Sequence, residues 1–254
     1  RVEERERTRE RYREARHDVV VRRRDLEDRI DELADLVTLG DADLDAPVEN
    51  LREPIETYNQ AVAEAFDRRK REDPARDLLA FVETTAAYPL VEYRQPPDDL
   101  LAYVRDSEAG SEPIPTLLEY ADYSVSKLEH YVPDARRLKR NVATHQTYLR
   151  RLDPGPLEIA WPPPEPEALR WRCRELIAVV GRIAPEDVVA KLRTVRELPS
   201  RTDYERLRES VRAREQLTDA ERDRLERGDV EAELSALRDE RDRLEAALAE
   251  YAGP

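Results

Sequence analysis

Residues that could do chemistry are few in this chain, which has three histidines and one cysteine among 254 residues. Glu14 and His17 lie three residues apart, a spacing that places both on one helix face and that helical di-iron sites use. Such sites need this pair twice, with two further glutamates, whereas here it occurs once in a highly charged segment. We therefore expect His17 to be solvated and expect no metal or other cofactor.

Cys173 continues an apolar stripe at helical spacing, so a buried, inert thiol is expected. Catalysis would need an electropositive and partly open environment. Arg172 and Arg174 are its sequence neighbours, but adjacent residues on a helix point in different directions. His145 continues another apolar stripe and is expected to pack at the edge of a core. Without a zinc-spaced Cys/His cluster or a glycine-rich phosphate loop, the sequence predicts a protein that is not an enzyme.

Positive charge gathers in residues 135–152, which contain six basic residues and no acid in a chain of net charge −14. On one helix over 134–152, Arg136, Arg140 and Arg151 share the face opposite the apolar stripe. This pattern indicates a surface for anions or nucleic acid. The alternative is a face that docks acidic neighbours of the same chain or is simply solvated. Residues 118–138 resemble a helix-turn-helix, and they fit one unbroken helix equally well.

Seven of the eleven tyrosines lie between Tyr88 and Tyr148. Tyrosine in place of phenylalanine indicates a tyrosine-rich core, in which each buried hydroxyl needs a hydrogen-bond partner. An enzyme site in this region is the alternative interpretation.

The overall composition is acidic and poor in lysine, with 58 acidic against 44 basic residues, four lysines and no methionine. Such a composition is typical of proteins adapted to a salty interior, where the Debye length falls to about 3 Å at 1 M and repulsion between carboxylates is screened. A single cysteine excludes an internal disulfide and fits a reducing compartment. The longest apolar run, residues 78–82, is too short for a membrane span. We expect a cytoplasmic protein with no membrane contact; because the chain starts at Arg1, a short leader could have been removed.

Heptad repeats mark both ends of the chain. Each end has apolar residues at alternating spacings of three and four, the seam of a coiled coil. In an antiparallel pair, one register sets Val37 opposite Val230 and Leu33 opposite Leu234. The predicted seam residues are Val19, Leu26, Ile30, Leu33, Val37, Val230, Leu234, Leu237, Leu244 and Leu248.

Prolines divide the middle of the chain, since none precedes Pro47 and only Pro254 follows Pro199. Because proline disrupts helix interiors, this region must consist of shorter helices joined by turns. The expected helices cover 48–72, 75–87, 97–107, 115–132, 134–152, 166–183 and 185–198. Residues 157–161 could form a short strand, although no partner strand is evident.

The heptads, the acidity and the scarcity of lysine and methionine together resemble an uncharacterised helical family of salt-loving archaea, of the kind described only as a domain of unknown function. The resemblance covers the composition of the whole chain and its two end segments. It implies no activity and assigns no functional residue.

These observations predict an all-α fold. A helical domain over 46–200 lies between an N-terminal helix, 1–40, and C-terminal helices, 201–254, whose coiled-coil segment is 229–252. The two end helices are expected to form an antiparallel coiled-coil stalk within one molecule. The alternative is that each end pairs with its copy in a dimer. The predicted function is a structural, adaptor or tether role with a protein partner or a second copy. Nucleic-acid association through the 134–152 helix is the first alternative, and an enzyme with a site in the tyrosine-rich middle is the second.

Overall fold

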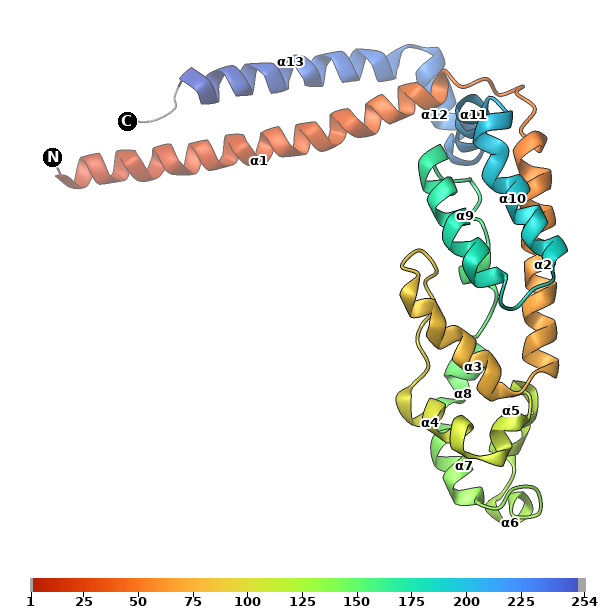
Figure 1. Ribbon diagram of the computed structural model, residues 1–254. Coiled ribbons are helices and arrows are strands. Elements are labelled where there is room, and N and C mark those ends of the chain that lie inside the picture. Colours follow the sequence, from red (N-terminus) through yellow and green to blue (C-terminus); the bar gives the residue numbers. More distant parts are fainter. Residues whose placement is uncertain (1, 251–254) are drawn as a thin grey trace. The chain divides into compact units, whose positions relative to one another are not determined.

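The structure is a computed structural model that describes residues 2–250, and in that range the chain forms helices and turns with no strand (Figure 1). The predicted all-α fold is confirmed. The chain separates into two compact units. Unit 1 joins the two ends, Arg1–Ala46 and Arg206–Pro254, and unit 2 is Pro47–Glu205.

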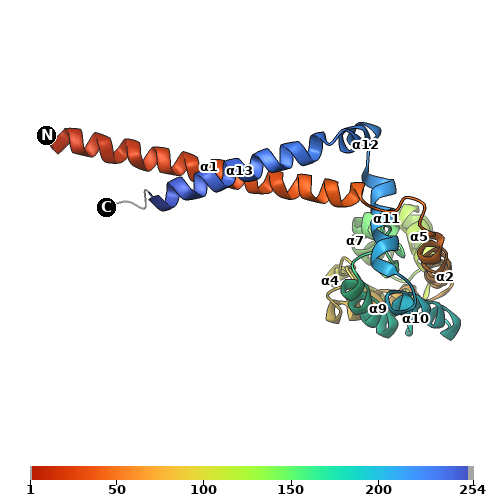
Figure 2. The ribbon, with the colours of Figure 1, turned by 90° about the horizontal axis from the view of Figure 1, so that it is seen from above.

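Unit 1 is dominated by two long helices, α1 (Val2–Gly40) and α13 (Asp229–Glu250). They lie side by side and run in opposite directions in both views (Figures 1 and 2). Two shorter helices precede α13: α11 (Tyr204–Gln216), which belongs to unit 1 from Arg206 onward, and α12 (Asp219–Glu226). Thr218 and Glu221 form a capping box that starts α12. Gly228, with φ of +72°, makes the corner into α13 in a conformation that favours glycine.

The longest helices of unit 2 are α2 (Glu49–Glu72), α9 (Pro166–Val180) and α10 (Glu186–Arg201). α10 packs against both of the others. Each contributes an apolar stripe at helical spacing, as an amphipathic helix should. The buried stripe of α2 consists of Leu51, Ile55, Tyr58, Val62, Ala65 and Phe66.

The rest of unit 2 consists of short helices. They are α3 (Ala75–Thr84), α4 (Asp98–Asp106), α5 (Ile114–Asp122), α6 (Val125–Leu128), α7 (Ala135–Asn141) and α8 (Gln146–Arg150), with 3-10 turns at Thr85–Ala87, Glu108–Ser111, Ala143–His145 and Gly155–Leu157. Prolines occupy the N-cap positions of α3, α4, α5 and α10. Prolines therefore mark where these four helices begin. Pro54 and Pro199 lie instead inside α2 and α10.

Two predicted helices are wrong as single elements. The 115–132 helix breaks at Tyr123, whose ψ of 152° is extended, and the Ser124 hydroxyl caps α6 instead. The 134–152 helix breaks between Val142 and His145, where a 3-10 turn separates α7 from α8. His145 has φ −107° and ψ 18°, outside the α region, and its imidazole Nε2 lies 2.9 Å from the Asp99 carboxylate.

Residues 157–161 form no strand. The amide of Ile159 donates to the Asn59 side chain at 2.9 Å, and its carbonyl accepts from the same side chain at 2.8 Å. The Tyr58 hydroxyl donates to the Leu157 carbonyl at 2.7 Å. Side chains of α2 thus satisfy backbone groups that a neighbouring strand would otherwise pair.

Candidate functional site

The helix pair of unit 1 is closed by a small apolar cluster. Ile30, Leu33, Val230 and Leu234 are buried in it, and Val37 and Leu237 pack against it partly buried. Leu26, one heptad before Leu33, is 2% exposed. These residues belong to the heptad seam described above, so the α1–α13 contact in this part of unit 1 excludes water.

Ion pairs flank the seam and follow the antiparallel direction. Arg22 contacts Glu240 at 3.1 Å, and Arg29 contacts Glu233 at 3.0 Å. Arg29 lies seven residues after Arg22 on α1, and its partner Glu233 lies seven residues before Glu240 on α13, as antiparallel helices require. Because these side chains are largely exposed, each pair contributes about 1 kcal/mol or less to stability. They select the register and direction of the pair more than they stabilise it.

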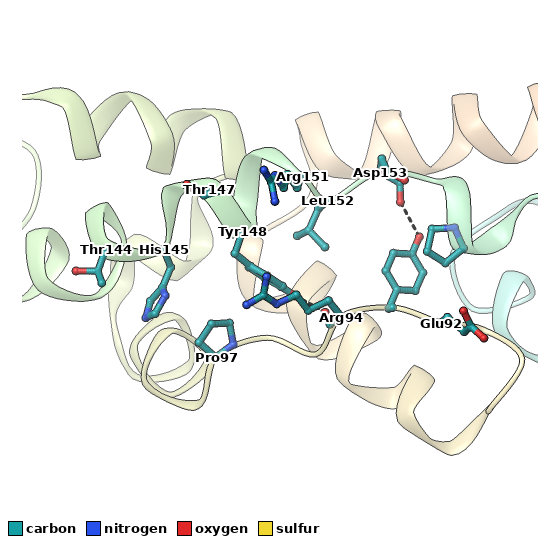
Figure 3. Close-up of a pocket in the computed structure, with 12 residues that line it drawn as sticks. Glu92, Arg94, Pro97, Thr144, His145, Thr147, Tyr148, Arg151, Leu152 and Asp153 are labelled. Atoms are coloured by element: carbon teal, nitrogen blue, oxygen red, sulfur yellow. Dashed lines mark hydrogen bonds between the residues drawn. The ribbon is translucent and has the colours of Figure 1, made fainter. Parts of the chain in front are cut away.

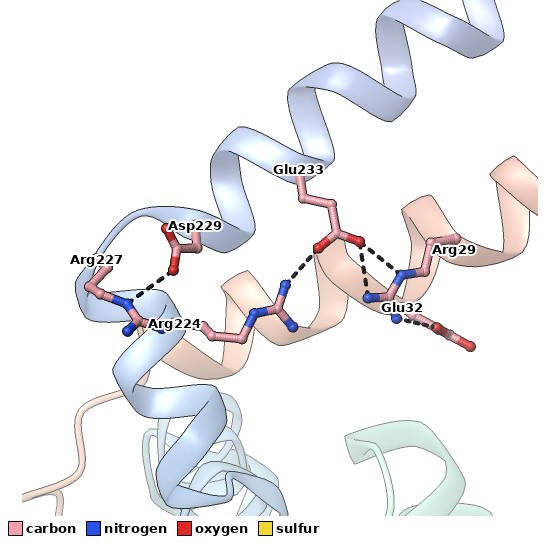
Figure 4. A network of polar contacts seen from close by, with 6 residues as sticks. All are labelled: Arg29, Glu32, Arg224, Arg227, Asp229 and Glu233. Atoms are coloured by element: carbon pink, nitrogen blue, oxygen red, sulfur yellow. Dashed lines mark hydrogen bonds and ion pairs between the residues drawn. The ribbon is translucent and has the colours of Figure 1, made fainter.

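Glu233 is the centre of a larger polar network at the corner between α12 and α13 (Figure 4). It accepts hydrogen bonds from Arg29 at 3.0 Å and from Arg224 at 2.6 Å. Arg29 also donates to Glu32 at 2.9 Å, and the bonds to Glu32 and Glu233 raise its guanidinium pKa. One carboxylate therefore links α1, α12 and α13.

Farther along α1 toward its N-terminus, the seam is open. The seam residues Val19, Leu244 and Leu248 are only half-buried there. Val20 and Val21, which lie outside the seam, are more than 40% exposed. An apolar groove of about 260 Å³ lies there between the two helices. It is lined by Tyr12, Ala15, Arg16, Val19, Ala247 and Leu248.

The six basic residues of 135–152 divide into two groups. Arg137 pairs with Asp106 at 3.6 Å, Arg150 pairs with Asp122 at 3.5 Å, and Lys139 donates to the Ala121 carbonyl. The other three are those singled out by the sequence. Arg136 and Arg140 lie exposed on α7, and Arg151 lies exposed just after α8; none of the three makes an ion pair with a described residue.

A pocket of about 430 Å³ lies in unit 2 (Figure 3). Two short segments of the loop before α4 and the stretch from Thr144 to Pro156 line it. Its charged lining residues are Glu92, Arg94, Arg151 and Asp153, and His145 also lines it.

The walls of this pocket are tied together by buried tyrosines. The Tyr148 hydroxyl donates to the Arg94 carbonyl at 3.1 Å, and the Tyr93 hydroxyl donates to the Asp153 carbonyl at 3.0 Å. Burial raises the pKa of both phenols, so they stay protonated and keep donating. Tyr93 also stacks on Phe66 with ring centroids 6.0 Å apart. These tyrosines hold the loop and the α8 segment in place.

Arg94, Glu92 and Asp153 were not singled out from the sequence. Arg94 and Asp153 lie 59 residues apart, and no local spacing connects them. The one available signal was the pair of prolines after Arg94, which indicates a stiff, non-helical segment at Pro96 and Pro97.

Cys173 is fully buried, and burial raises the pKa of its thiol to about 12. Such a thiol is protonated at neutral pH and is a poor nucleophile. His17 and Glu14 are exposed on α1, and His130 is exposed in unit 2. Across residues 2–250, no three His, Cys, Asp or Glu side chains are grouped so that they could hold a metal ion.

No helix within residues 2–250 combines the length and apolar character needed to cross a membrane. No curated protein and no solved structure matches the chain. One family, described as Domain of unknown function (DUF7118), matches residues 1–248. Because the match extends over nearly all 254 residues, the chain belongs to the DUF7118 family.

Proposed function

We propose that this protein is a non-catalytic interaction protein whose α1–α13 pair is an antiparallel coiled coil that docks a second copy of itself. The observation that carries the proposal is the apolar groove between the helices at Tyr12–Val19 and Ala247–Leu248. Nearer the α12–α13 corner, five residues of the seam are buried: Leu26, Ile30, Leu33, Val230 and Leu234. An apolar seam left open beside a closed one is the kind of surface that another helix covers.

Charge favours a second copy as the occupant. Residues 10–24 of α1 carry six arginines against three acids, whereas α13 carries eight acids against three arginines. In a two-fold arrangement of two helix pairs, α1 of one copy lies beside α13 of the other. The basic segment 10–24 of each α1 then lies beside an acidic α13 on both sides, which favours pairing between copies.

Analytical ultracentrifugation over a concentration series tests this. The double variant Val19→Arg plus Leu248→Arg places two charges in the groove and should convert a dimer into a monomer. The matched control, Ala236→Arg plus Ala246→Arg, adds the same charge at two exposed positions of α13 and should remain a dimer. A wild-type chain that stays monomeric at high concentration contradicts self-association. Recovery of a helical protein with the wild type and not with the groove variant would then identify a different partner.

Pairing of α1 and α13 within one chain is tested separately from association with a second copy. A disulfide between Leu33→Cys and Leu234→Cys, made in a Cys173→Ala background, tests it. Both positions lie in one buried cluster, so rapid bond formation within a monomer is expected. Crosslinks that form only between chains would show that each end pairs with its copy in another molecule.

A non-catalytic role is supported by the state of the reactive side chains. The Cys173 thiol is buried and protonated, and the His145 imidazole is held by the Asp99 carboxylate at 2.9 Å. A cytoplasmic location in a salt-accumulating cell is part of the same proposal, because the surface is acidic and poor in lysine. Thermal melts in increasing KCl should then show rising stability, since salt screens the repulsion of a chain of net charge −14. A melting temperature that falls or does not change would contradict salt adaptation.

Nucleic-acid association is a second candidate, favoured by the exposure of Arg136, Arg140 and Arg151 without ion-pair partners among the described residues. Three cations make few phosphate contacts, and the logarithm of affinity falls with a slope of about −0.9 per contact on the logarithm of salt concentration. We expect no sequence-selective duplex binding in molar KCl. Tight, selective binding that is lost in Arg136→Glu plus Arg140→Glu would promote this candidate over the first.

A further inference from the structure

We propose that the pocket of unit 2 binds a small phosphate monoester, with the phosphate between Arg94 and Arg151 and the remainder of the ligand directed toward Glu92 and Asp153. This site is independent of the helix pair discussed above. The pocket volume of about 430 Å³ suits a small metabolite.

The two arginines are the first reason. Neither the Arg94 nor the Arg151 guanidinium makes an ion pair or a hydrogen bond with a described residue, although both line the pocket. Arg172, in the same unit, is an arginine whose donors are used to hold the backbone. It donates to the carbonyls of Leu90 at 2.6 Å and Glu158 at 2.8 Å, and also to that of Pro156. Unlike Arg172, Arg94 and Arg151 keep their donors available, and a guanidinium suits bidentate binding of phosphate.

Hydroxyl groups supply the second reason. Thr144 and Thr147 both line the pocket and are exposed. In Figure 3, Thr144 lies beyond His145 with its hydroxyl directed away from Arg94 and Arg151. Their hydroxyls donate to no described residue. Thr147, next to Tyr148 in the sequence, would add a neutral donor to the two guanidinium groups. Since these three side chains can donate, the group they suit best is a multiply charged oxyanion.

The break in the predicted 134–152 helix makes this arrangement. His145 sits at the break, and its Nε2 is 2.9 Å from the Asp99 carboxylate, which anchors the turn to the start of α4. The hydrogen bond from His145 lowers the pKa of Asp99 and keeps that carboxylate charged. This contact pairs the Asp99 carboxylate with His145 rather than with Arg94 or Arg151.

The opposite end of the pocket has the opposite charge. Glu92 and Asp153 line it, and one Asp153 oxygen already accepts from the Gly155 amide at 2.9 Å. Two carboxylates at this end disfavour a second anionic group and favour hydroxyl or amino groups. Between the two ends lie the buried rings of Tyr93 and Tyr148 and the side chain of Leu152. A ligand with one phosphate and a hydroxyl- or amine-bearing remainder matches this polarity.

The tyrosine hydrogen bonds described above give the site its rigidity. Tyr148 holds the Arg94 backbone and Tyr93 holds the Asp153 backbone, so both ends of the pocket are fixed before a ligand arrives. A preformed site loses little entropy on binding. Binding should therefore shift resonances near the pocket without a global change.

Nuclear magnetic resonance titration of the full chain tests the proposal, with inorganic phosphate and O-phosphoethanolamine as probes. All titrations use one KCl concentration, chosen so that the wild type and every variant have the same melting temperature. Saturable shifts are expected at the amides of residues 93–95 and 144–153, with phosphoethanolamine binding more tightly than phosphate. In Arg94→Gln plus Arg151→Gln, affinity should fall about tenfold or more.

The matched control is Arg136→Gln plus Arg140→Gln, which removes the same charge from α7, outside the pocket lining. It should bind both probes as the wild type does. If both double variants lose affinity equally, the binding is diffuse surface electrostatics and the proposal is overturned. It is also overturned if no shift saturates, or if the shifts lie away from the pocket. Thr147→Val, which keeps every charge, should weaken phosphate binding by a smaller factor, and unchanged binding in it would contradict the role of that hydroxyl.

Discussion

Ion-paired arginines and arginines that donate to backbone carbonyls occur in both units. Arg214 of unit 1 donates to the Ala46 carbonyl at 2.9 Å, and Arg150 of unit 2 pairs with Asp122 at 3.5 Å. The two units differ in the arginine contacts that their longest helices make. In unit 1, Arg22, Arg29 and Arg224 reach carboxylates on a facing or neighbouring helix, mostly at the exposed surface. In unit 2, Arg69 and Arg172 donate instead to backbone carbonyls in part-buried positions, at 2.7 Å to Ile183 and 2.8 Å to Glu158. Exposed ion pairs specify which helices pack together. Arginines that donate to backbone carbonyls hold irregular loops, which have no regular backbone hydrogen bonds of their own.

The apolar cores of the two units also differ. The helix pair of unit 1 buries a small apolar cluster, and the contact between its helices is open at the Val19–Leu248 end. Unit 2 contains many side chains with almost no exposed surface, among them Tyr58, Phe66 and Tyr103. We expect substitutions to cost more in unit 2 than in unit 1, and more at the closed part of the seam than at the open part.

The largest effect should come from Phe66→Ala. Phe66 is fully buried on α2 and stacks on Tyr93, so its truncation should destabilise unit 2 by about 3–5 kcal/mol. Trp171 is 55% exposed, and Trp171→Ala should cost about 0.5 kcal/mol or less as the control. Urea unfolding followed by amide hydrogen exchange in α2 and α9 measures both. Equal costs would show that burial does not rank positions in this unit.

Leu33→Ala should come next, at about 2–4 kcal/mol, because Leu33 is 1% exposed in the unit 1 cluster. Leu244→Ala, at a half-buried seam position, should cost about 1 kcal/mol. Hydrogen exchange of the α13 amides in monomeric protein reports the difference. If the Leu244 variant loses as much protection as the Leu33 variant, the seam is closed along its whole length.

A pair of arginine variants compares the two uses of charge directly. Arg172→Gln removes the donor to two part-buried carbonyls, those of Pro156 and Glu158, and should cost about 1–3 kcal/mol. Arg29→Gln removes an exposed ion pair and should cost about 1 kcal/mol or less. Added salt should reduce the Arg29 effect and leave the Arg172 effect nearly unchanged, because screening acts on exposed charges. Denaturation at two KCl concentrations checks this, and the reverse salt dependence would contradict it.

The smallest effect is the pH dependence of stability, which should have opposite signs for Glu221 in unit 1 and Glu158 in unit 2. The Thr218 hydroxyl and amide lower the pKa of Glu221, so its stabilisation is present above its unfolded pKa of about 4.3 and is lost as pH falls through the folded pKa. Burial and the nearby Asp153 raise the pKa of Glu158, so stability falls as pH rises from the unfolded pKa through the folded one.

At neutral pH, Glu221→Gln should therefore lower the melting temperature, and Glu158→Gln should raise it slightly. Melts between pH 3 and pH 7 give both curves. A Glu158 variant that is less stable than the wild type at pH 7 would show that this carboxylate has a stabilising partner that outweighs its burial.

Periodicity and proline position predicted most of the fold. The spacing of Leu26, Ile30 and Leu33 identified the long N-terminal helix, and the prolines at 74, 97, 113 and 185 marked where helices begin. These signals are local: an apolar stripe or a fixed φ acts within one or two turns of the residue that carries it. The sequence by itself therefore determined the all-α class and the bounds of the long helices.

The candidate pocket depended on contacts between distant segments. Nothing near His145 in the sequence indicated a helix break, because Asp99 lies 46 residues away. Arg94 and Arg151 likewise meet one pocket only after the loop before α4 and the α8 segment have packed, with Tyr93 and Tyr148 joining them. Periodicity within one segment carries no information about which side chain of another segment will face it. Only the tertiary structure decided which arginines donate to backbone carbonyls and which keep donors available in the pocket.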